Sequence, residues 1–292
     1  MRLRSLFTLL FMLALSITLL FQACSSSGST NADTITNRMA TEHQTDRPVA
    51  TPLASTEPAI PVSIEPVEYA TVDGQPVIGY LAKPEDAAGG LPGIIAIHEW
   101  WGLNDNIKAT AQRLAGEGYT VLAVDLYGGQ FAEAPEQARS LMQAVMQNPE
   151  PANSNLKQAY DYLVNQQMAP TVGSIGWCFG GGWSLRTGLL LPNQLDAVVI
   201  YYGRLVTDPA DLEPLQMPIL GLFGATDQAI PVEQVNAFEA ALDSLDKPAE
   251  IYVYENAGHA FANPSGNRYE PEAAEDAWEK TTTFFREHLQ AS

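Results

Sequence analysis

The feature that most constrains the fold is a regular alternation of short apolar runs with longer amphipathic stretches. Runs of six to eight residues, such as 93–98 and 218–223, carry mostly apolar side chains. Such runs are typical of strands buried on both faces of a parallel sheet. Intervening stretches such as 104–117 repeat apolar side chains at helical spacing. The alternation predicts an α/β fold, with a mostly parallel central sheet and helices on both faces.

The boundaries of the elements follow from this pattern and from turn residues. A hairpin is expected over 67–82, because Asp73-Gly74 favours a tight turn. Further strands are expected at 93–98, 119–126, 171–176, 195–201, 218–223 and 249–254. Helices are expected at 104–117, 133–147, 154–167, 180–191, 231–245 and 271–289, with Pro149 and Pro151 separating the second from the third. Reactive residues should lie directly after strands, where parallel sheets bind ligands.

The first residues form a targeting pattern. Arg2 and Arg4 precede an uncharged apolar run over 6–21, and a small residue then precedes Cys24. The pattern predicts a secretory signal peptide over 1–23. An uncleaved anchor helix is the competing interpretation, because the run is close to the shortest length that spans a membrane.

The segment Leu-Phe-Gln-Ala-Cys at 20–24 resembles a bacterial lipoprotein signal. This resemblance implies lipidation of Cys24 and places the protein in the cell envelope, anchored to a membrane; a plain secreted protein is the alternative. Residues 24–60 are rich in Ser, Thr, Ala and Pro and are expected to be a flexible linker that includes His43. One domain is expected over 61–292.

Composition excludes several functional classes. Lys and Arg total 15 against 34 Asp and Glu, which gives a net charge of −19. Nucleic-acid partners are excluded, because a phosphate backbone requires a basic surface. The acidic residues are spread in small groups, so they predict a solvated surface. Two cysteines give no disulfide framework, and we expect a monomer without metal or cofactor.

A glycine-rich motif, Gly-Trp-Cys-Phe-Gly-Gly at 176–181, follows a predicted strand and opens a helix. It has the form of a nucleophile elbow, with Cys178 where serine is usual. Glycines let the strand and the helix approach, and the helix N-terminus favours a thiolate. The amide of Phe179 would face the substrate oxygen. A buried structural cysteine beside a turn is the alternative.

Two more polar residues follow predicted strands. Asp227 follows the strand 218–223, and His259 follows the strand 249–254. Taken singly, an aspartate that caps a helix and an ordinary loop histidine are the plainer interpretations. Their order after Cys178, however, is nucleophile, acid, base, as in hydrolases of this topology. Together the three residues predict a catalytic triad.

The segment His-Glu-Trp-Trp-Gly at 98–102 follows another predicted strand. The amide of Trp100 is expected to complete an oxyanion hole with that of Phe179. Glu99 is a second candidate catalytic carboxylate, or else a solvent-facing loop residue. His98, at the strand end, could lie near the site.

These motifs together resemble those of the dienelactone hydrolase family, the carboxymethylenebutenolidases. The matching segments are 98–102, Asp-Leu-Tyr at 125–127, 176–181, Tyr-Tyr-Gly at 201–203, Gly-Ala-Thr-Asp at 224–227 and Ala-Gly-His-Ala-Phe-Ala at 257–262. The resemblance implies an α/β-hydrolase that cleaves a small ester or lactone with a Cys178-His259-Asp227 triad. It also implies that Glu99 contacts the resting thiol and helps to deprotonate it.

The substrate-binding positions depart from the family pattern. Members that cleave dienelactone hold its carboxylate with two arginines. Asn263 stands at one of these positions, and Arg139 lies one turn beyond the other, while Arg204 and Arg268 are further candidates. We therefore expect a less polar substrate and an aromatic-walled pocket. The candidate aromatic residues, whose alternative role is core packing, are Trp100, Trp101, Trp177 and Phe261.

Two other functions compete with hydrolysis. An envelope protein on the same scaffold could bind a small molecule without turnover, since a fold does not by itself give a function. A redox role for Cys178 is the second, although the sequence offers no resolving cysteine in the domain.

Overall fold

The computed structural model describes residues 37–44, 57–87 and 89–290. The expected signal peptide and Cys24 lie outside these residues, so lipidation and export stay predictions. Within the described part of the chain, no helix is both long enough and apolar enough to cross a membrane.

An eight-stranded sheet forms the centre of the described molecule, in the order β1-β2-β4-β3-β5-β6-β7-β8. Strand β2 pairs antiparallel with both of its neighbours, β1 and β4. All the other neighbouring pairs in this order, from β4-β3 to β7-β8, are parallel. This confirms the mostly parallel sheet. The strands are β1 (Val62–Val72), β2 (Gln75–Pro84), β3 (Gly93–Ile97), β4 (Thr120–Val124), β5 (Val172–Trp177), β6 (Ala197–Tyr201), β7 (Ile219–Gly224) and β8 (Ala249–Tyr254).

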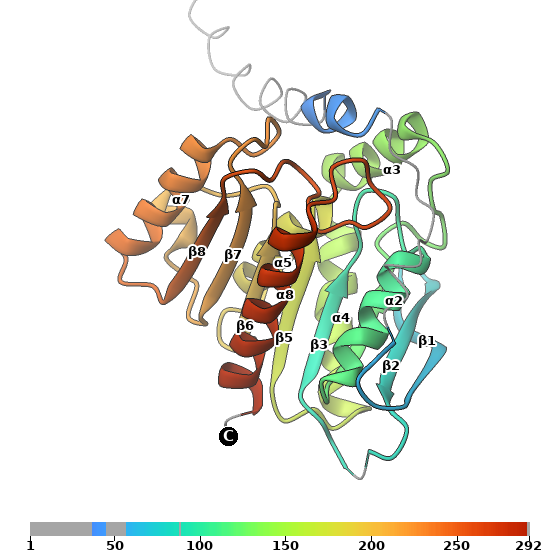
Figure 1. Cartoon of the computed structure of the whole chain (residues 1–292). Coiled ribbons are helices and arrows are strands. Elements are labelled where there is room, and N and C mark those ends of the chain that lie inside the picture. Colours follow the sequence, from blue (N-terminus) through green and yellow to red (C-terminus); the bar gives the residue numbers. More distant parts are fainter. Residues whose placement is uncertain (1–36, 45–56, 88, 291–292) are drawn as a thin grey trace, which may run out of the picture.

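Helices cover both faces of the sheet. In Figure 1, α2 (Asp105–Gly116) and α8 (Pro271–Phe285) lie in front, and α4 (Glu150–Asn165) lies behind. The central strands β3 to β7 are buried along their whole length, which explains their uninterrupted apolar runs. Further helices are α3 (Pro135–Gln147), α5 (Phe179–Leu190), the short α6 (Pro209–Leu212), α7 (Val232–Ser244) and the π-helix η1 (Arg286–Gln290).

Two elements start four or more residues before their predicted start. Helix α4 begins at Glu150, four residues before the predicted start, because Pro151 lies in its first turn. A proline there loses no helical hydrogen bond, so it starts this helix instead of only separating two. Strand β1 extends back to Val62, where it still pairs with Pro84 of β2.

Residues 37–44 are not an extended linker. The His43 amide donates to the Met39 carbonyl at 3.1 Å, which closes a helical turn. Both side chains are buried, at 0% and 3% exposure. In Figure 1 this helix, coloured blue, lies at the end of the sheet toward which its parallel strands run. The linker prediction is wrong for this segment, which we call the docked segment. Its helix is too short to show a helical period in the sequence, so the pattern could not predict it.

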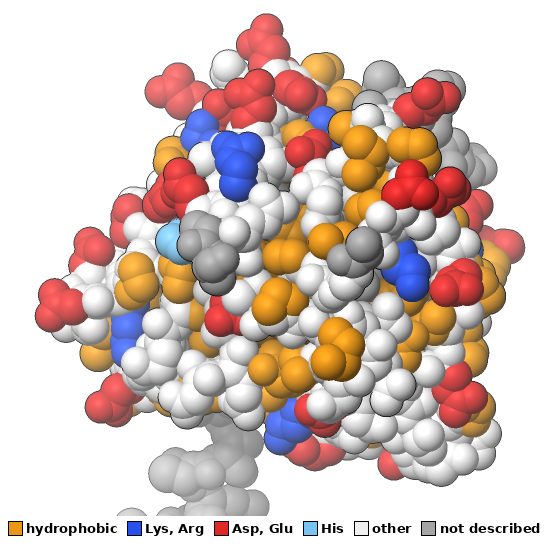
Figure 2. All heavy atoms as spheres, turned by 90° about the horizontal axis from the view of Figure 1, so that it is seen from below, with side chains coloured by type: hydrophobic (Ala, Val, Ile, Leu, Met, Phe, Trp, Pro, Cys, Tyr) orange, Lys and Arg blue, Asp and Glu red, His pale blue; other side chains and the backbone are white. Residues whose placement is uncertain are grey.

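Many of the acidic side chains lie on the surface. Figure 2 shows the molecule from below: Asp and Glu side chains are scattered around its edge, with only a few Lys and Arg between them. The charge of −19 is therefore not gathered in one patch on this face. This agrees with the expected solvated acidic surface.

Candidate active site

Cys178 lies on the tight turn between β5 and α5. Its backbone has φ 57° and ψ −115°, in the left-handed region that side chains rarely adopt. Its amide donates to the Tyr201 carbonyl at 3.0 Å, which fixes the turn against β6. Such strained positions cluster at functional sites. The side chain is fully buried at the N-terminus of α5.

The glycines of the motif permit this turn. A Cβ on Gly176 would collide with the backbone of Gly180. A Cβ on Gly180 would collide with the carbonyl oxygens of Ile97 and His98, at the end of β3. Helix α5 can therefore pack against β3 and β5 only because these positions lack side chains.

Asp227 uses both carboxylate oxygens. Oδ1 accepts hydrogen bonds from the amides of Ala229 at 2.7 Å and Ile230 at 2.9 Å. Oδ2 lies 2.7 Å from Nδ1 of His259. The alternative interpretation of Asp227, a loop aspartate that caps a helix, is therefore only partly correct. Asp227 does close a loop, but it does not cap α7, whose N-cap is Pro231. The second oxygen orients His259.

His259 is fully buried. Its Nδ1 faces Asp227, and its Nε2 has no hydrogen-bond partner within the described chain. A ring nitrogen of His259 and Sγ of Cys178 lie within 4.8 Å of each other. Burial lowers the pKa of His259, but the charges of Asp227 and the Cys178 thiolate outweigh it and raise that pKa well above its ordinary value. The surroundings thus favour the imidazolium form of His259 beside Cys178.

Glu99 is nearly buried, and its Oε2 accepts a hydrogen bond from Nδ2 of Asn263 at 2.5 Å. Oδ1 of Asn263 in turn accepts from the amide and hydroxyl of Ser265, at 2.9 and 2.6 Å. Asn263, at the position of a family arginine, therefore binds Glu99. From the sequence, Asn263 was notable only because it departs from the family arginine at that position. Its contact with Glu99 joins residues 164 positions apart, so local sequence does not predict it.

Tyr202 is a further residue of the site. The sequence motif Tyr-Tyr-Gly at 201–203 contains it but predicts no role for it. Its ring centroid lies 5.3 Å from that of His259, and its buried hydroxyl has no hydrogen-bond partner in the described part of the chain. Burial, followed by the charges of Glu99 and Cys178, raises its pKa well above the ordinary value. Tyr202 therefore remains a neutral phenol beside His259. The Tyr-Tyr-Gly motif was the available signal.

The loop after β3 is held by His98. Nε2 of His98 accepts from the Leu126 amide at 3.1 Å, and Nδ1 donates to the Glu99 carbonyl at 2.5 Å. Burial lowers the pKa of His98, which keeps it neutral for these contacts. The Trp100 carbonyl accepts from the Tyr127 hydroxyl at 3.1 Å. His98 thus supports the loop that carries Glu99 and Trp100.

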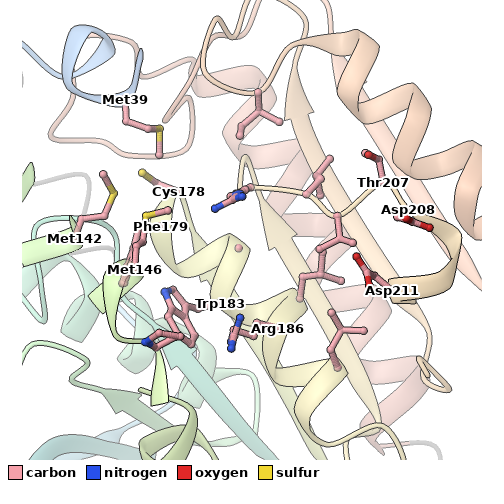
Figure 3. A pocket seen from close by; sticks show the side chains of 18 residues that line it. Met39, Met142, Met146, Cys178, Phe179, Trp183, Arg186, Thr207, Asp208 and Asp211 are labelled. Atoms are coloured by element: carbon pink, nitrogen blue, oxygen red, sulfur yellow. The ribbon is translucent and has the colours of Figure 1, made fainter. Parts of the chain in front are cut away.

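A cavity of about 470 Å³ reaches Cys178 and Phe179. Figure 3 shows Met142 and Met146 of α3 on one side, Met39 of the docked segment near Cys178, and Arg186 of α5 deeper in. The far side carries Thr207, Asp208 and Asp211. The other lining residues are Pro149, Gly182, Trp183, Leu185, Leu189, Arg204, Leu205, Val206 and Ile230.

The expected aromatic wall is not the wall of this cavity. Phe261 and Trp101 are buried at 0% and 1% exposure, and Phe261 packs among tyrosine rings of the core. Trp177 lines a separate cavity of about 70 Å³. Nη2 of Arg139 donates to Oδ1 of Asn37 at 2.5 Å, so Arg139 binds the docked segment. Methionines, aliphatic side chains and two other rings, Phe179 and Trp183, line the cavity instead.

His43 is the residue that sequence reasoning missed. It is fully buried, and its Nε2 lies 3.8 Å from Sγ of Cys178. Its ring centroid lies 4.6 Å from Trp100 and 5.2 Å from His259. Its Nδ1 lies 3.2 Å from a guanidinium nitrogen of Arg268. Only the scarcity of histidines, four in the chain, could have drawn attention to it.

His43, Cys178 and His259 each place one atom capable of binding a metal within 4.8 Å of the others. A guanidinium can only donate, so Arg268 requires Nδ1 of His43 to accept. The proton of the neutral ring is then on Nε2, which faces Cys178. A protonated nitrogen cannot bind a metal, so this arrangement favours a hydrogen bond. The absence of a resident metal stays a prediction.

Comparison with known proteins places these features in a family. The model of the dienelactone hydrolase family matches residues 77–289. Protein usf of Aquifex pyrophilus is 33% identical over 224 residues, which cover 74% of this chain and 96% of that protein. A provisionally named carboxymethylenebutenolidase of Escherichia coli is 32% identical over 272 residues, covering 86% and 98% of the two chains.

A solved structure supports the same assignment. A provisionally named dienelactone hydrolase from Klebsiella pneumoniae has a TM-score of 0.70 and 28% identity, covering 77% of this chain and 98% of that one. The similarities confirm the α/β-hydrolase fold and the hydrolase class that the motifs predicted. The chain, with its elbow cysteine and its strand-end carboxylate and histidine, therefore belongs to the dienelactone hydrolase family.

Proposed function

We propose that this protein hydrolyses carboxylic esters or lactones through Cys178, His259 and Asp227. The observation that carries the proposal is the buried Asp227–His259 pair at 2.7 Å, with the other face of the imidazole turned toward the elbow cysteine. Each of the three side chains comes from a different strand end, which is the arrangement that an acyl-transfer site requires.

In the acylation step, Nε2 of His259 takes the proton of the Cys178 thiol, and the thiolate attacks the acyl carbon. The amides of Trp100 and Phe179 would hold the resulting oxyanion. The carbon–oxygen bond then breaks, and His259 returns the proton to the leaving alkoxide. The acyl group remains on sulfur as a thioester; with a lactone, the released alcohol stays attached to that acyl group.

In the deacylation step, His259 takes a proton from water, and the resulting hydroxide attacks the thioester. The carbon–sulfur bond breaks, and the acid product leaves. Asp227 keeps Nδ1 of His259 protonated throughout, so that Nε2 can both accept and donate. Glu99 assists removal of the thiol proton in the resting enzyme, with Asn263 fixing its orientation.

The cavity indicates the kind of acyl group. Three methionines, Met39, Met142 and Met146, line it near the nucleophile, and flexible thioether side chains suit varied apolar groups. Asn263 stands where the family pattern has an arginine. Arg204 lines the same cavity and can bind a substrate carboxylate instead. We infer an ester or lactone with an apolar acyl portion, accommodated within about 470 Å³.

The test is a panel of aryl esters and lactones, with wild type compared with Cys178→Ala. We expect kcat/KM to fall by about 10³-fold or more in the variant, because the nucleophile is removed. Cys24→Ala is the matched control and should keep full turnover, because it removes a thiol but leaves the proposed nucleophile Cys178 in place.

Substantial ester turnover by Cys178→Ala would contradict the proposal. Saturable binding of the same compounds by wild type without any hydrolysis would instead support a binding protein on a hydrolase scaffold.

A further inference from the structure

We propose that His43 is a further catalytic residue, which donates a hydrogen bond from Nε2 to the sulfur of Cys178 and stabilises the thiolate. The proposal rests on the proposed function of Cys178 as the nucleophile. It adds a residue from outside the span 77–289 that the family model matches.

The docked segment is anchored in a way that directs His43 inward. Met39 and His43 are four residues apart, so one helical turn places both on the same face, and both are buried. Contacts at each end hold the segment. Oδ1 of Asn37 accepts from Arg139 at 2.5 Å, and Oε2 of Glu42 lies 3.6 Å from a guanidinium nitrogen of Arg268.

Arg268 places the proton on the required nitrogen of His43. Its Nε donates to the His259 carbonyl at 2.9 Å, and its Nη2 lies 3.2 Å from Nδ1 of His43. Nδ1 must therefore accept, and Nε2 carries the hydrogen. Nε2 lies 3.8 Å from Sγ, within hydrogen-bond reach of a sulfur acceptor. The same arginine thus ties His43 to the catalytic loop.

The chemistry gives this donor a clear purpose. When Cys178 passes its proton to His259, a thiolate and an imidazolium form where both side chains are 0% exposed. Buried charges are costly unless hydrogen bonds replace their lost hydration. A donor at Sγ supplies such a bond without adding net charge.

The remaining groups around the thiolate set its electrostatic surroundings. Glu99 comes from the loop after β3, Tyr127 from the loop after β4 and Tyr202 from the loop after β6. Burial raises the pKa of both tyrosines, and the charge of Cys178 raises it further. Arg204 shares the cavity, and Asp227 acts through His259. Among these residues His43 supplies the contact at 3.8 Å to the sulfur.

His43 leaves the nucleophile accessible from the cavity. Cys178 and Met39 both line the 470 Å³ space, whereas His43 is not among its lining residues and packs against Trp100 and His259. In Figure 3, the cavity approaches Cys178 from α3 and α5. The nucleophile therefore borders a space that His43 does not line.

The experiment measures alkylation of Cys178 by iodoacetamide across pH, in the full chain without substrate, with peptide mass spectrometry to separate it from Cys24. We expect His43→Ala to lower the alkylation rate at pH 6 by about tenfold and to move the half-maximal rate to higher pH, because the thiolate loses a donor. His43→Gln, which keeps an N–H near the same place, should recover most of the rate. Thr41→Ala, on the exposed side of the docked segment, is the matched control and should match wild type.

Two results would overturn the proposal. The first is an alkylation profile of His43→Ala that coincides with that of wild type. The second is faster alkylation together with higher esterase activity, which would mean that the ring blocks the site. Because alkylation needs no substrate, the result stands apart from the hydrolase test with Cys178→Ala.

Discussion

Single atoms decide the roles of the site residues. Asp227 would be an ordinary loop aspartate if only Oδ1 were occupied, because that oxygen satisfies two backbone amides. The 2.7 Å contact of Oδ2 with His259 adds a second role. His43 shows the same dependence, since one contact with Arg268 decides which of its nitrogens carries the proton.

Asp227→Asn separates these two roles. Asparagine keeps an oxygen for the loop amides but places an N–H₂ opposite Nδ1 of His259, which forces the wrong tautomer. We expect kcat to fall by about 10³- to 10⁴-fold, with the unfolding free energy changed by less than about 1 kcal/mol. Ester hydrolysis and urea unfolding measure the two quantities.

Asp227→Ala is the matched comparison, because it also removes the loop acceptor. It should lose similar activity and a further ~1 kcal/mol of stability. An Asp227→Asn variant with near wild-type kcat would show that the carboxylate only closes the loop.

At the level of elements, the junction of β5 with α5 positions Cys178, the proposed nucleophile. Helix α5 starts immediately after Cys178 and packs so closely that Gly180 touches the end of β3. The docked segment is a second element at the same edge, held by Arg139 and Arg268. The site is thus built from the ends of five strands, β3, β5, β6, β7 and β8, and from one segment that precedes the sheet.

Gly180→Ala tests the junction. The new Cβ would meet the carbonyl oxygens of Ile97 and His98, which belong to backbone and cannot rotate away. We expect a loss of about 3 kcal/mol in the unfolding free energy, measured by urea denaturation. Gly182→Ala in the same helix is the control, because its Cβ would lie 3.3 Å from Arg204, which is a tight contact but not a collision; it should lose clearly less stability. Equal stability of the two variants would contradict the tight junction.

At the scale of the whole molecule, the fold buries an ionisable group that water would otherwise solvate. The pKa of His259 is raised in the folded state because, although burial opposes it, the charges of Asp227 and Cys178 favour the imidazolium. In the unfolded chain a histidine titrates near 6.5, so protonation is linked to folding. The stability that this linkage contributes is fully present below about pH 6.5 and is lost as pH rises through the raised pKa.

His259→Gln removes this linkage. The difference in unfolding free energy between wild type and variant should therefore be largest near pH 6 and should shrink by about pH 10. Urea unfolding at a series of pH values measures it. A difference that stays constant or grows with pH would contradict the raised pKa.

The sequence by itself determined the sheet, the elbow and the order of the three strand-end residues. These depend on local periodicity and on glycines whose effect is confined to a few neighbours, so they can be predicted from the chain. The family followed from the same motifs, and the comparisons confirm it.

Only the tertiary structure decided which side chains surround those residues. His43 and Asn263 reach the site through segments with no periodic pattern, and Arg139 binds Asn37 across 102 positions of sequence. The aromatic residues near the motifs pack into the core, while methionines from α3 and the docked segment line the cavity. Such contacts depend on how distant surfaces pack against one another, which local sequence does not encode.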